Sequence, residues 1–208
     1  MYLKRFSAPS TWTLQRKGIK YSARSIPGPH SKAQGMPLVL WLRHLGYVTT
    51  SREAKKVLPD ISVDGRVVRD IRMPVGYQDL LSVGNDTYLI TYDALGKLTA
   101  VSTKNKEKCC RITGKTTRKG KLQIQLHDGR TMLIDKAPYA IGDSLLLKVP
   151  KQEVVKHLKL AQGANVQLTG GKHTGTTGTI KEIEANTITY TSGGAQETTL
   201  KKYAHVLP

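Results

Sequence analysis

The first candidate for chemistry is a glycine-rich stretch near the end of the chain. Four glycines fall within residues 170–178, and Lys172 and His173 lie among them. Glycines let a backbone bend sharply and approach a ligand or another backbone closely. The stretch could therefore hold a nucleotide phosphate, as in an enzyme, or it could form the loop of a small β-barrel that contacts RNA.

The residues around this stretch argue against a nucleotide-phosphate site. A P-loop has the sequence G-x-x-x-x-G-K-[ST] and leads into a helix. Aligning Gly171-Lys172 with its G-K pair puts Val166 where the first glycine belongs and His173 where a hydroxyl should meet magnesium. The segment TIKEI that follows favours a strand, so no helix N-terminus would face a phosphate.

The same stretch resembles the KOW motif, a loop joining two strands that occurs in ribosomal proteins and transcription factors. Val166–Leu168 supplies the alternating first strand, Gly178 lies where the motif has a glycine, and the return strand is expected to start at Thr179. Lys172 and His173 could then meet phosphates and sugars. The glycine turns between short strands suit a small closed barrel.

The whole chain is strongly basic. Its 208 residues carry a formal net charge of +18, which attracts polyanions, nucleic acid before an anionic membrane surface. The longest apolar run, Met36 to Leu42, is far shorter than the roughly 20 residues of a membrane helix, and Met1 to Trp12 has no signal-peptide pattern. We therefore expect a cytoplasmic protein that does not bind membranes.

The first 35 residues are a basic segment with little regular periodicity. Nine cations and no anion precede Glu53. We expect an arm without a core of its own that becomes ordered on a phosphate backbone. Phe6, Trp12 and Tyr21 are costly to leave in water and could stack on bases. The alternative is a solvated tail that binds nothing specific.

A second basic cluster covers residues 104–121, with eight cations and the single acidic residue Glu107. Its threonines and glycines predict a strand–loop–strand whose tip faces an anion, or else an ordinary solvated hairpin. Cys109 and Cys110 lie inside it. Two adjacent thiols supply neither a disulfide framework nor a four-ligand zinc site, so we expect small apolar strand residues in a reducing compartment.

Residues 37–58 predict two short helices. Pro37 suits a first helical turn, and Gly46 suits the position that follows a C-cap. Thr50 and Glu53 have the spacing of a capping box at the second helix. Pro59 should end that helix.

A change of period after the helices predicts a hairpin. Ile61 and Val63 alternate, and Asp64-Gly65 suits a tight turn. The segment SREAKKVLPDISVDGRVVRDIRMPVGYQDLLSV resembles the small αL-type RNA-binding domain of several ribosomal proteins and RNA-modifying enzymes. That resemblance implies a compact unit with its cations along one groove.

Strands are expected for most of the remaining chain. Alternation predicts them from Thr87 to Lys148, with turns near residues 93–96 and 127–129. Residues 151–160 could form a basic helix, but a strand fits better beside so many others. His157 in this segment is expected at the surface rather than as a ligand.

The collinear order of the motifs carries a broader resemblance. PSTWTLQRKG, GPHSKAQGMPLVLWLR, DGRVVRDIRMPVGYQDLLSV, YDALGKL, HDGRTM and VQLTGGKHTGTTGTI follow one another along the chain. Nearly end to end, the chain resembles the small-subunit ribosomal proteins of the fourth, e-type family of archaea and eukaryotes. Its end at Pro208, just past the barrel, is expected of an archaeal-like member.

The expected fold class is α+β, in four segments. They are a basic arm at 1–35, an αL-type RNA-binding domain at 36–85, a β-rich central domain at 86–160 and a KOW-type, SH3-like barrel at 161–208.

The resemblance implies a structural constituent of the small ribosomal subunit that binds rRNA and supports assembly and translation. The implied partners are small-subunit rRNA and neighbouring ribosomal proteins, with no catalysis, cofactor, metal or small-molecule substrate. Binding would proceed by counterion release and shape recognition.

The candidate RNA-binding residues are mostly cations of the arm, the helical segment, the basic hairpin and the glycine loop: Lys4, Arg5, Trp12, Arg16, Lys17, Lys20, Arg24, His30, Lys32, Arg43, Arg52, Lys55, Lys56, Arg66, Arg69, Lys115, Arg118, Lys119, Lys121, Lys172 and His173.

Two other classes of protein remain as alternatives. An RNA-modifying enzyme could use the αL-type module to hold its substrate, but it would need a positioned Asp, Cys or acid–base pair. Turn chemistry accounts for Asp128 and Asp143, a third carboxylate lies at Asp135, and neither cysteine has a histidine nearby in sequence. A KOW-containing transcription factor would associate with RNA polymerase instead of ribosomes.

Overall fold

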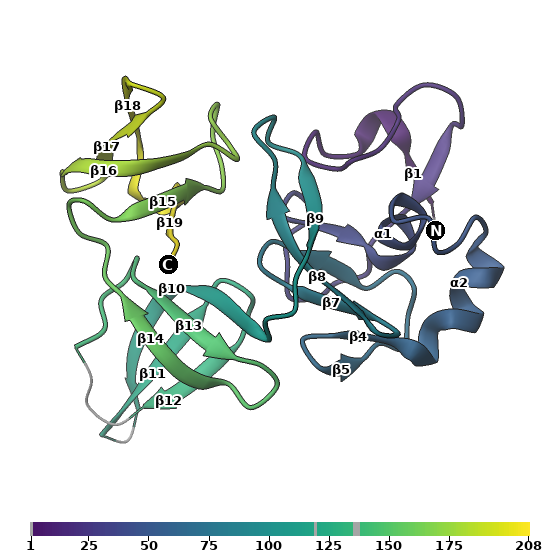
Figure 1. Ribbon diagram of the computed structural model, residues 1–208, viewed down its shortest axis with the longest axis horizontal. Helices are drawn as coiled ribbons and strands as arrows, with labels where there is room; N and C mark the ends of the chain where they lie inside the picture. The colour runs from purple at the N-terminus through teal and green to yellow at the C-terminus, as the bar shows by residue number, and fades with distance from the viewer. Residues whose placement is uncertain (1, 119, 135–137) are drawn as a thin grey trace. The chain divides into compact units, whose positions relative to one another are not determined.

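The computed structural model describes residues 2–118, 120–134 and 138–208 (Figure 1). Most of the regular structure in these residues is β-strand. The residues also contain the two short α-helices that the sequence predicted and three 3₁₀ helices that it did not predict. The chain divides into two compact units, Met1–Tyr92 with Lys97–Lys106 and Asp93–Gly96 with Glu107–Pro208. None of the described helices is long and apolar enough to cross a membrane.

The first unit contains both α-helices and nine strands. Its elements are β1 (Tyr2–Lys4), η1 (Arg5–Ser7), β2 (Tyr21–Ala23), β3 (Gly35–Pro37), α1 (Leu38–His44), α2 (Ser51–Val57), η2 (Leu58–Asp60), β4 (Ile61–Val63), β5 (Arg66–Val67), β6 (Pro74–Gly76), β7 (Leu80–Val83), β8 (Asp86–Tyr92) and β9 (Leu98–Ser102).

One antiparallel sheet organises this unit, in the strand order β5-β4-β7-β8-β9. Its apolar side chains and those of α1 form one core, in which Trp41, Ile61 and Ile90 are completely buried. The Trp41 indole N–H donates to the carbonyl of Val75 at 3.0 Å, so its polar atom is satisfied inside the core.

The helix ends follow the capping signals of the sequence. Thr50 caps α2 through a complete capping box with Glu53, and Gly46 has the positive φ of +80° expected after a C-cap. Pro37 differs slightly from expectation. It ends β3 and occupies the N-cap of α1, so the helix begins at Leu38.

The first 35 residues do not lack a core. Strands β1 and β2 pair with each other, and Leu3, Ala8 and Trp12 are buried in the same apolar cluster as α1. The expectation that Trp12 stacks on bases is wrong, because its side chain is buried and its indole N–H donates to the carbonyl of Lys32 at 3.0 Å. The segment is therefore structured without a partner.

The second unit is composed almost entirely of strands. Its elements are β10 (Glu107–Arg118), β11 (Lys121–Leu126), β12 (Thr131–Ile134), β13 (Ser144–Lys148), β14 (Glu153–Leu158), β15 (Asn165–Leu168), β16 (Thr177–Ile183), β17 (Thr187–Ser192), β18 (Ala195–Leu200), η3 (Lys201–Tyr203) and β19 (Ala204–Val206).

Two five-stranded antiparallel sheets make up this unit, in the orders β12-β11-β10-β13-β14 and β18-β17-β16-β15-β19. Each sheet has its own apolar cluster, one including Cys110 and the other Val166. Both cysteines are buried in β10, and residues 153–158 form a strand, as the sequence predicted.

Glycines in the second sheet allow close approach of neighbouring groups. A Cβ on Gly178 would lie 2.5 Å from the carbonyl oxygen of Thr191 on the paired strand β17. The return strand β16 starts at Thr177, so Gly178 lies within it and not before it. Strand β16, rather than a helix, follows the glycine loop, which agrees with the argument against a P-loop.

The two units do not follow the four segments expected from sequence. A boundary at residue 85 would separate β7 from β8, yet these strands pair from Leu80 with Leu89 to Val83 with Asp86. The hydrogen-bonded sheet continues to Ser102.

Candidate nucleic-acid interface

A groove of about 500 Å³ in the first unit gathers cations from three separate parts of the sequence. Strand β2 leads into Arg24, helix α2 carries Lys55, and the loop after β5 supplies Arg69 and Arg72. All four side chains are exposed. Cations on converging elements with little acid between them suit an anionic backbone better than a small neutral ligand.

One carboxylate lies inside this groove. Asp70 accepts hydrogen bonds from the Arg72 guanidinium at 2.9 and 3.2 Å and from the Arg72 backbone N–H at 2.8 Å. Hydrogen bonding from Arg72 holds the pKa of Asp70 below its ordinary value. Asp70 therefore stays ionised at neutral pH and offsets one of the four positive charges.

A second hollow of about 460 Å³ shares Arg24 and Arg72 with the first and is also lined by Lys32 and His30. The expectation that His30 contacts RNA is not supported, because its side chain is only 1% exposed. Its Nε2 lies 2.7 Å from a carboxylate oxygen of Asp79, which also accepts the N–H of Gly76. His30 therefore stabilises the wall of the hollow.

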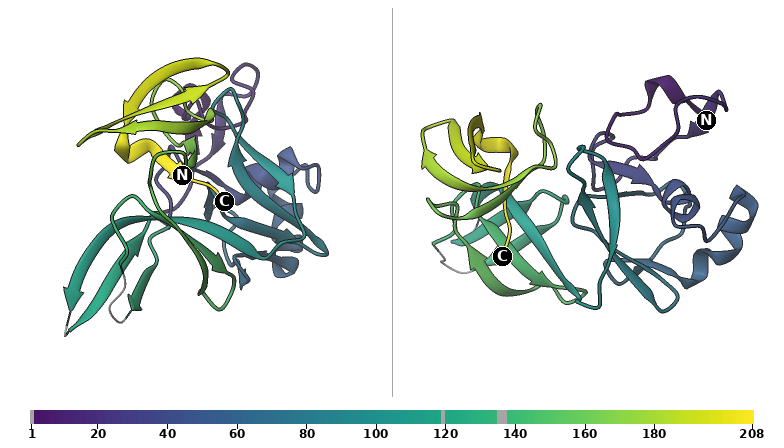
Figure 2. Two further views of the ribbon diagram at one scale, coloured as in Figure 1. Left: turned by 60° about the vertical axis from the view of Figure 1, so that its left-hand side comes forward. Right: turned by 45° about the horizontal axis from the view of Figure 1, so that its top comes forward.

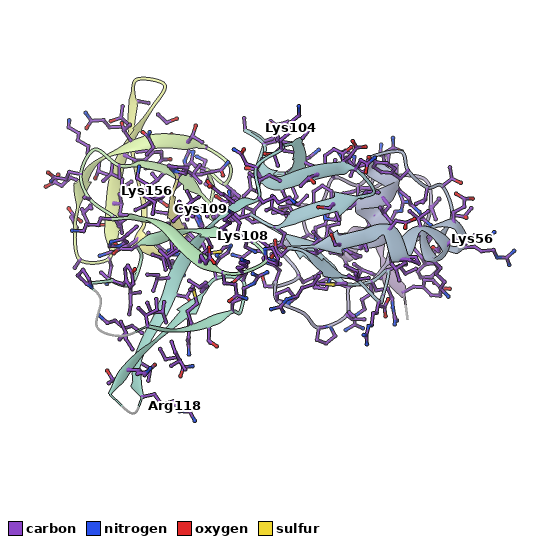
Figure 3. All side chains as sticks on the ribbon, turned by 60° about the horizontal axis from the view of Figure 1, so that its bottom comes forward. Lys56, Lys104, Lys108, Cys109, Arg118 and Lys156 are labelled. Atoms are coloured by element: carbon purple, nitrogen blue, oxygen red, sulfur yellow. The ribbon has the colours of Figure 1, made fainter. Side chains whose placement is uncertain are left out.

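The other cations predicted in the helical segment lie near the groove in sequence but do not line it. Arg52 and Lys56 are exposed on α2, and Figure 3 shows Lys56 pointing away from the helix. Arg43 donates to the Ser51 hydroxyl at 3.0 Å, and Arg66 is exposed on β5. Sequence reasoning missed Arg72, although it lies in the quoted segment DGRVVRDIRMPVGYQDLLSV, three residues after Arg69.

The cations predicted in the arm have mixed environments. Lys4, Lys17 and Lys20 are exposed, whereas the guanidinium groups of Arg5 and Arg16 donate to carbonyls of the same segment. Some cations of the arm therefore stabilise its fold, and others expose positive charge to solvent.

The long hairpin of β10 and β11 presents a basic tip in the second unit (Figures 2 and 3). Arg118 and Lys121 pair across it and are exposed, and Lys115 donates to the carbonyl of Tyr139 at 2.9 Å. The predicted Lys119 lies outside the described residues.

The glycine loop offers less positive charge than its sequence indicates. Lys172 is exposed, but Nδ1 of His173 lies 3.3 Å from a carboxylate oxygen of Glu197 on β18. The structure therefore leaves Lys172 as the exposed cation of the predicted pair.

Two of the three carboxylates considered for an RNA-modifying enzyme have structural partners in the second unit, and the third, Asp135, lies outside the described residues. Asp128 is buried against Lys108 at 2.9 Å and Arg130 at 3.1 Å, and Asp143 lies 2.7 Å from His157. The sequence placed His157 at the surface, whereas its side chain is half-buried and hydrogen-bonds to Asp143. Burial raises the pKa of Cys109 to about 12, which disfavours the thiolate needed for catalysis.

No group of three or more potential metal ligands is found among the residues that the structure describes. The candidate contacts with nucleic acid are the basic groove of the first unit and, in the second unit, the basic hairpin tip and Lys172.

Comparison with known proteins gives consistent matches. The family model "Ribosomal family S4e" matches residues 84–154, and the "RS4NT (NUC023) domain" matches residues 2–33. The small ribosomal subunit protein eS4 of Methanocella arvoryzae is 38% identical over 219 residues, covering 99% of this chain and 93% of the relative. The chain belongs to the S4e family of ribosomal proteins.

Further relatives of the S4e family are also archaeal. The eS4 protein of Picrophilus torridus is 40% identical, covering 85% of this chain and 79% of the relative. The crystal structure of 30S ribosomal protein S4e from Thermoplasma acidophilum matches with a TM-score of 0.73 and 26% identity, covering 84% of this chain and 95% of that one. The resemblance drawn from the collinear motifs is thereby confirmed.

Proposed function

We propose that this S4e protein is a structural, non-catalytic constituent of the small ribosomal subunit that binds rRNA and supports translation. The observation that carries the proposal is the match to archaeal eS4 proteins over 99% of the chain. The relatives' names do not support the transcription-factor or enzyme alternatives. The partners are small-subunit rRNA and neighbouring small-subunit proteins, in the cytoplasm.

The groove lined by Arg24, Lys55, Arg69 and Arg72 is the RNA-backbone site that we propose for the first unit. Convergence of these cations supports it, and the arrangement of two helices followed by a hairpin is in keeping with an αL-type domain. In the second unit we propose a KOW-type barrel formed by β15–β19, with Lys172 on its loop, and a further contact at the β10–β11 tip. We infer that these cations contact mainly the phosphate backbone, which positions a protein on nucleic acid.

Gradient fractionation tests the ribosomal role. At moderate salt the chain should sediment stoichiometrically with the small subunit, and high salt should release it because phosphate contacts weaken as counterions rebind. Sedimentation at the top of the gradient under both conditions would overturn the proposal, and copurification with RNA polymerase would favour a transcription factor.

Salt titration of rRNA-fragment binding tests the groove itself. Lys55→Gln with Arg69→Gln should reduce the log–log salt slope by about 1.4–1.8, since each phosphate contact contributes about 0.7–0.9. The matched variant Lys55→Arg with Arg69→Lys keeps both charges and should keep the slope. Equal salt slopes for the unaltered chain and both variants would mean that the phosphate contacts lie outside this groove.

A further inference from the structure

The N-terminal strand pair exposes aromatic rings that no part of the unit's core uses. Tyr2 is 79% exposed and Tyr21 is 48% exposed, whereas Leu3 and Ser22 between them in the ladder are buried. Leaving large apolar rings in water is informative when they are grouped, because grouped exposed apolar residues mark binding surfaces.

Strand register places these rings on one face. Tyr2 pairs with Ala23, and Lys4 pairs with Tyr21, so alternate residues of the two strands share the outward face. The rings of Tyr2 and Tyr21 lie 6.2 Å apart at their centroids with an interplanar angle of 48°. Nζ of Lys20 lies 5.6 Å from the centroid of Tyr21.

The charge around this aromatic face is predominantly positive, with Asp70 as the one carboxylate that lines the adjoining groove. Every charged side chain before Glu53 is a cation, and Lys4 lies on the face itself. Tyr2 and Ala23 also line the groove that holds Arg24, Lys55 and Arg69. A partner that fits must therefore combine flat apolar rings with regular negative charge.

We propose that the face formed by Tyr2, Lys4 and Tyr21 binds unpaired RNA nucleotides, with bases stacked on the tyrosines and the backbone continuing into the adjoining groove. This inference rests on the proposed function, which it deepens by naming single-stranded RNA as the partner. Aromatic platforms beside cations are the general means of holding unpaired bases, because every base has a flat π-face. Duplex RNA offers no such face, since its bases are already stacked.

The ring geometry restricts how a base can bind. Enclosing a base between two rings needs parallel rings about 7 Å apart, twice the ~3.5 Å separation of carbon atoms in contact. Tyr2 and Tyr21 are closer than this and tilted by 48°. A base therefore stacks on the outer side of a ring, not between the two.

Fluorescence anisotropy with labelled oligonucleotides tests the inference on the full chain. We expect Tyr2→Ala with Tyr21→Ala to weaken binding of a single-stranded adenosine oligonucleotide by about 5- to 150-fold, as expected for the loss of one stacked base. Binding of a blunt RNA duplex should change less than twofold. The salt slope should stay unchanged, because no cation is removed.

Two control variants separate stacking from other effects. Tyr2→Phe with Tyr21→Phe keeps the rings and should retain single-strand affinity. Leu95→Ala truncates an apolar residue that is also 79% exposed and should have no effect. Circular dichroism of each variant checks that the strand pair remains folded.

The outcomes distinguish this inference from the proposed function. If the alanine variant binds both the single strand and the duplex as tightly as the unaltered chain does, the stacking proposal is wrong. The ribosomal role would remain intact. Loss of subunit incorporation without any change in RNA affinity would assign the face to a protein neighbour and also overturn it. Absence of binding to any RNA by the unaltered chain would overturn both.

Discussion

At the scale of single residues, the charge of the groove depends on the Asp70–Arg72 ion pair. Asp70 occupies the Arg72 guanidinium with two hydrogen bonds. Asp70→Asn should remove this competition, strengthen RNA binding at low salt and steepen the salt slope by up to about 0.7–0.9, one phosphate contact. Anisotropy titrations at several salt concentrations measure both quantities. Asp60→Asn makes the same change in net charge on η2, outside the groove lining, and an equal gain there would remove the local explanation.

A second ion pair tests how the other unit is stabilised. Lys108 is completely buried with its Nζ 2.9 Å from Asp128. Burial alone would raise the pKa of Asp128, but the attraction and hydrogen bond of Lys108 leave it below its ordinary value. Asp128 is therefore ionised at neutral pH in the folded protein.

Lys108→Met should destabilise the second unit by about 3–5 kcal/mol, because it leaves a buried carboxylate with less compensation. Lys108→Met with Asp128→Asn removes both charges and should recover part of this loss. Urea denaturation followed in the second unit measures the difference. If Lys108→Met alone is as stable as the double variant, the expectation of about 3–5 kcal/mol is wrong. Arg130, 3.1 Å from the same carboxylate, would then compensate the charge of Asp128 without Lys108.

At the scale of elements, the capping box makes α2 sensitive to acid. The Thr49 N–H, followed by the hydroxyl and N–H of Thr50, lowers the pKa of Glu53 from 4.5 to about 2. A carboxylate whose pKa is depressed by folding stabilises the fold above its unfolded pKa and loses that contribution as pH falls through its folded pKa.

Glu53→Gln should therefore destabilise the first unit at neutral pH, and its difference from the unaltered chain should shrink between about pH 4.5 and pH 2. Denaturation midpoints across that range measure it. Glu182→Gln, at an exposed position on β16 of the second unit, is the matched control and should leave the stability of the first unit unchanged. If the loss of stability in Glu53→Gln is the same at every pH, the charge of Glu53 does not contribute to the cap.

The same helix marks what sequence can predict. Thr50, Glu53 and Gly46 act within a few residues, so local signals predicted both α-helices. The buried position of Trp12 depends on Lys32, twenty residues away, and that of His30 on Asp79, forty-nine residues away. Strands β1 and β2 have only three residues each, too few for a clear alternation, so their pairing and the groove beside them required the tertiary structure.

At the scale of the whole molecule, four acidic residues hold the backbone in place from buried positions. Asp64, Asp79, Asp128 and Asp143 are all buried. Each accepts a backbone N–H, from Leu80, Gly76, Arg130 and Ala140 respectively. Because these carboxylates are withdrawn from the surface, the chain presents a more uniformly basic exterior to a polyanion.

The apolar clusters also divide the molecule into parts with local cores. Every residue of the first cluster lies between Leu3 and Ala100, and the other two clusters lie between Cys110 and Val206. A fragment of residues 1–106 contains the complete first cluster and should fold alone. Far-ultraviolet circular dichroism and a cooperative thermal transition measure this.

A shorter fragment of residues 1–85 is the decisive control, because it ends where the sequence placed a domain boundary. It lacks β8 and β9, and with them the buried side chains of Ile90, Tyr92 and Leu98. Tyr92 stacks on Tyr77 at 5.0 Å, so its loss also exposes a ring inside the remaining core. Removing several large buried side chains costs about 2–5 kcal/mol each, comparable with the whole stability of a small domain. We therefore expect 1–85 to be unfolded where 1–106 is folded, and equal cooperativity of the two would restore the boundary at residue 85.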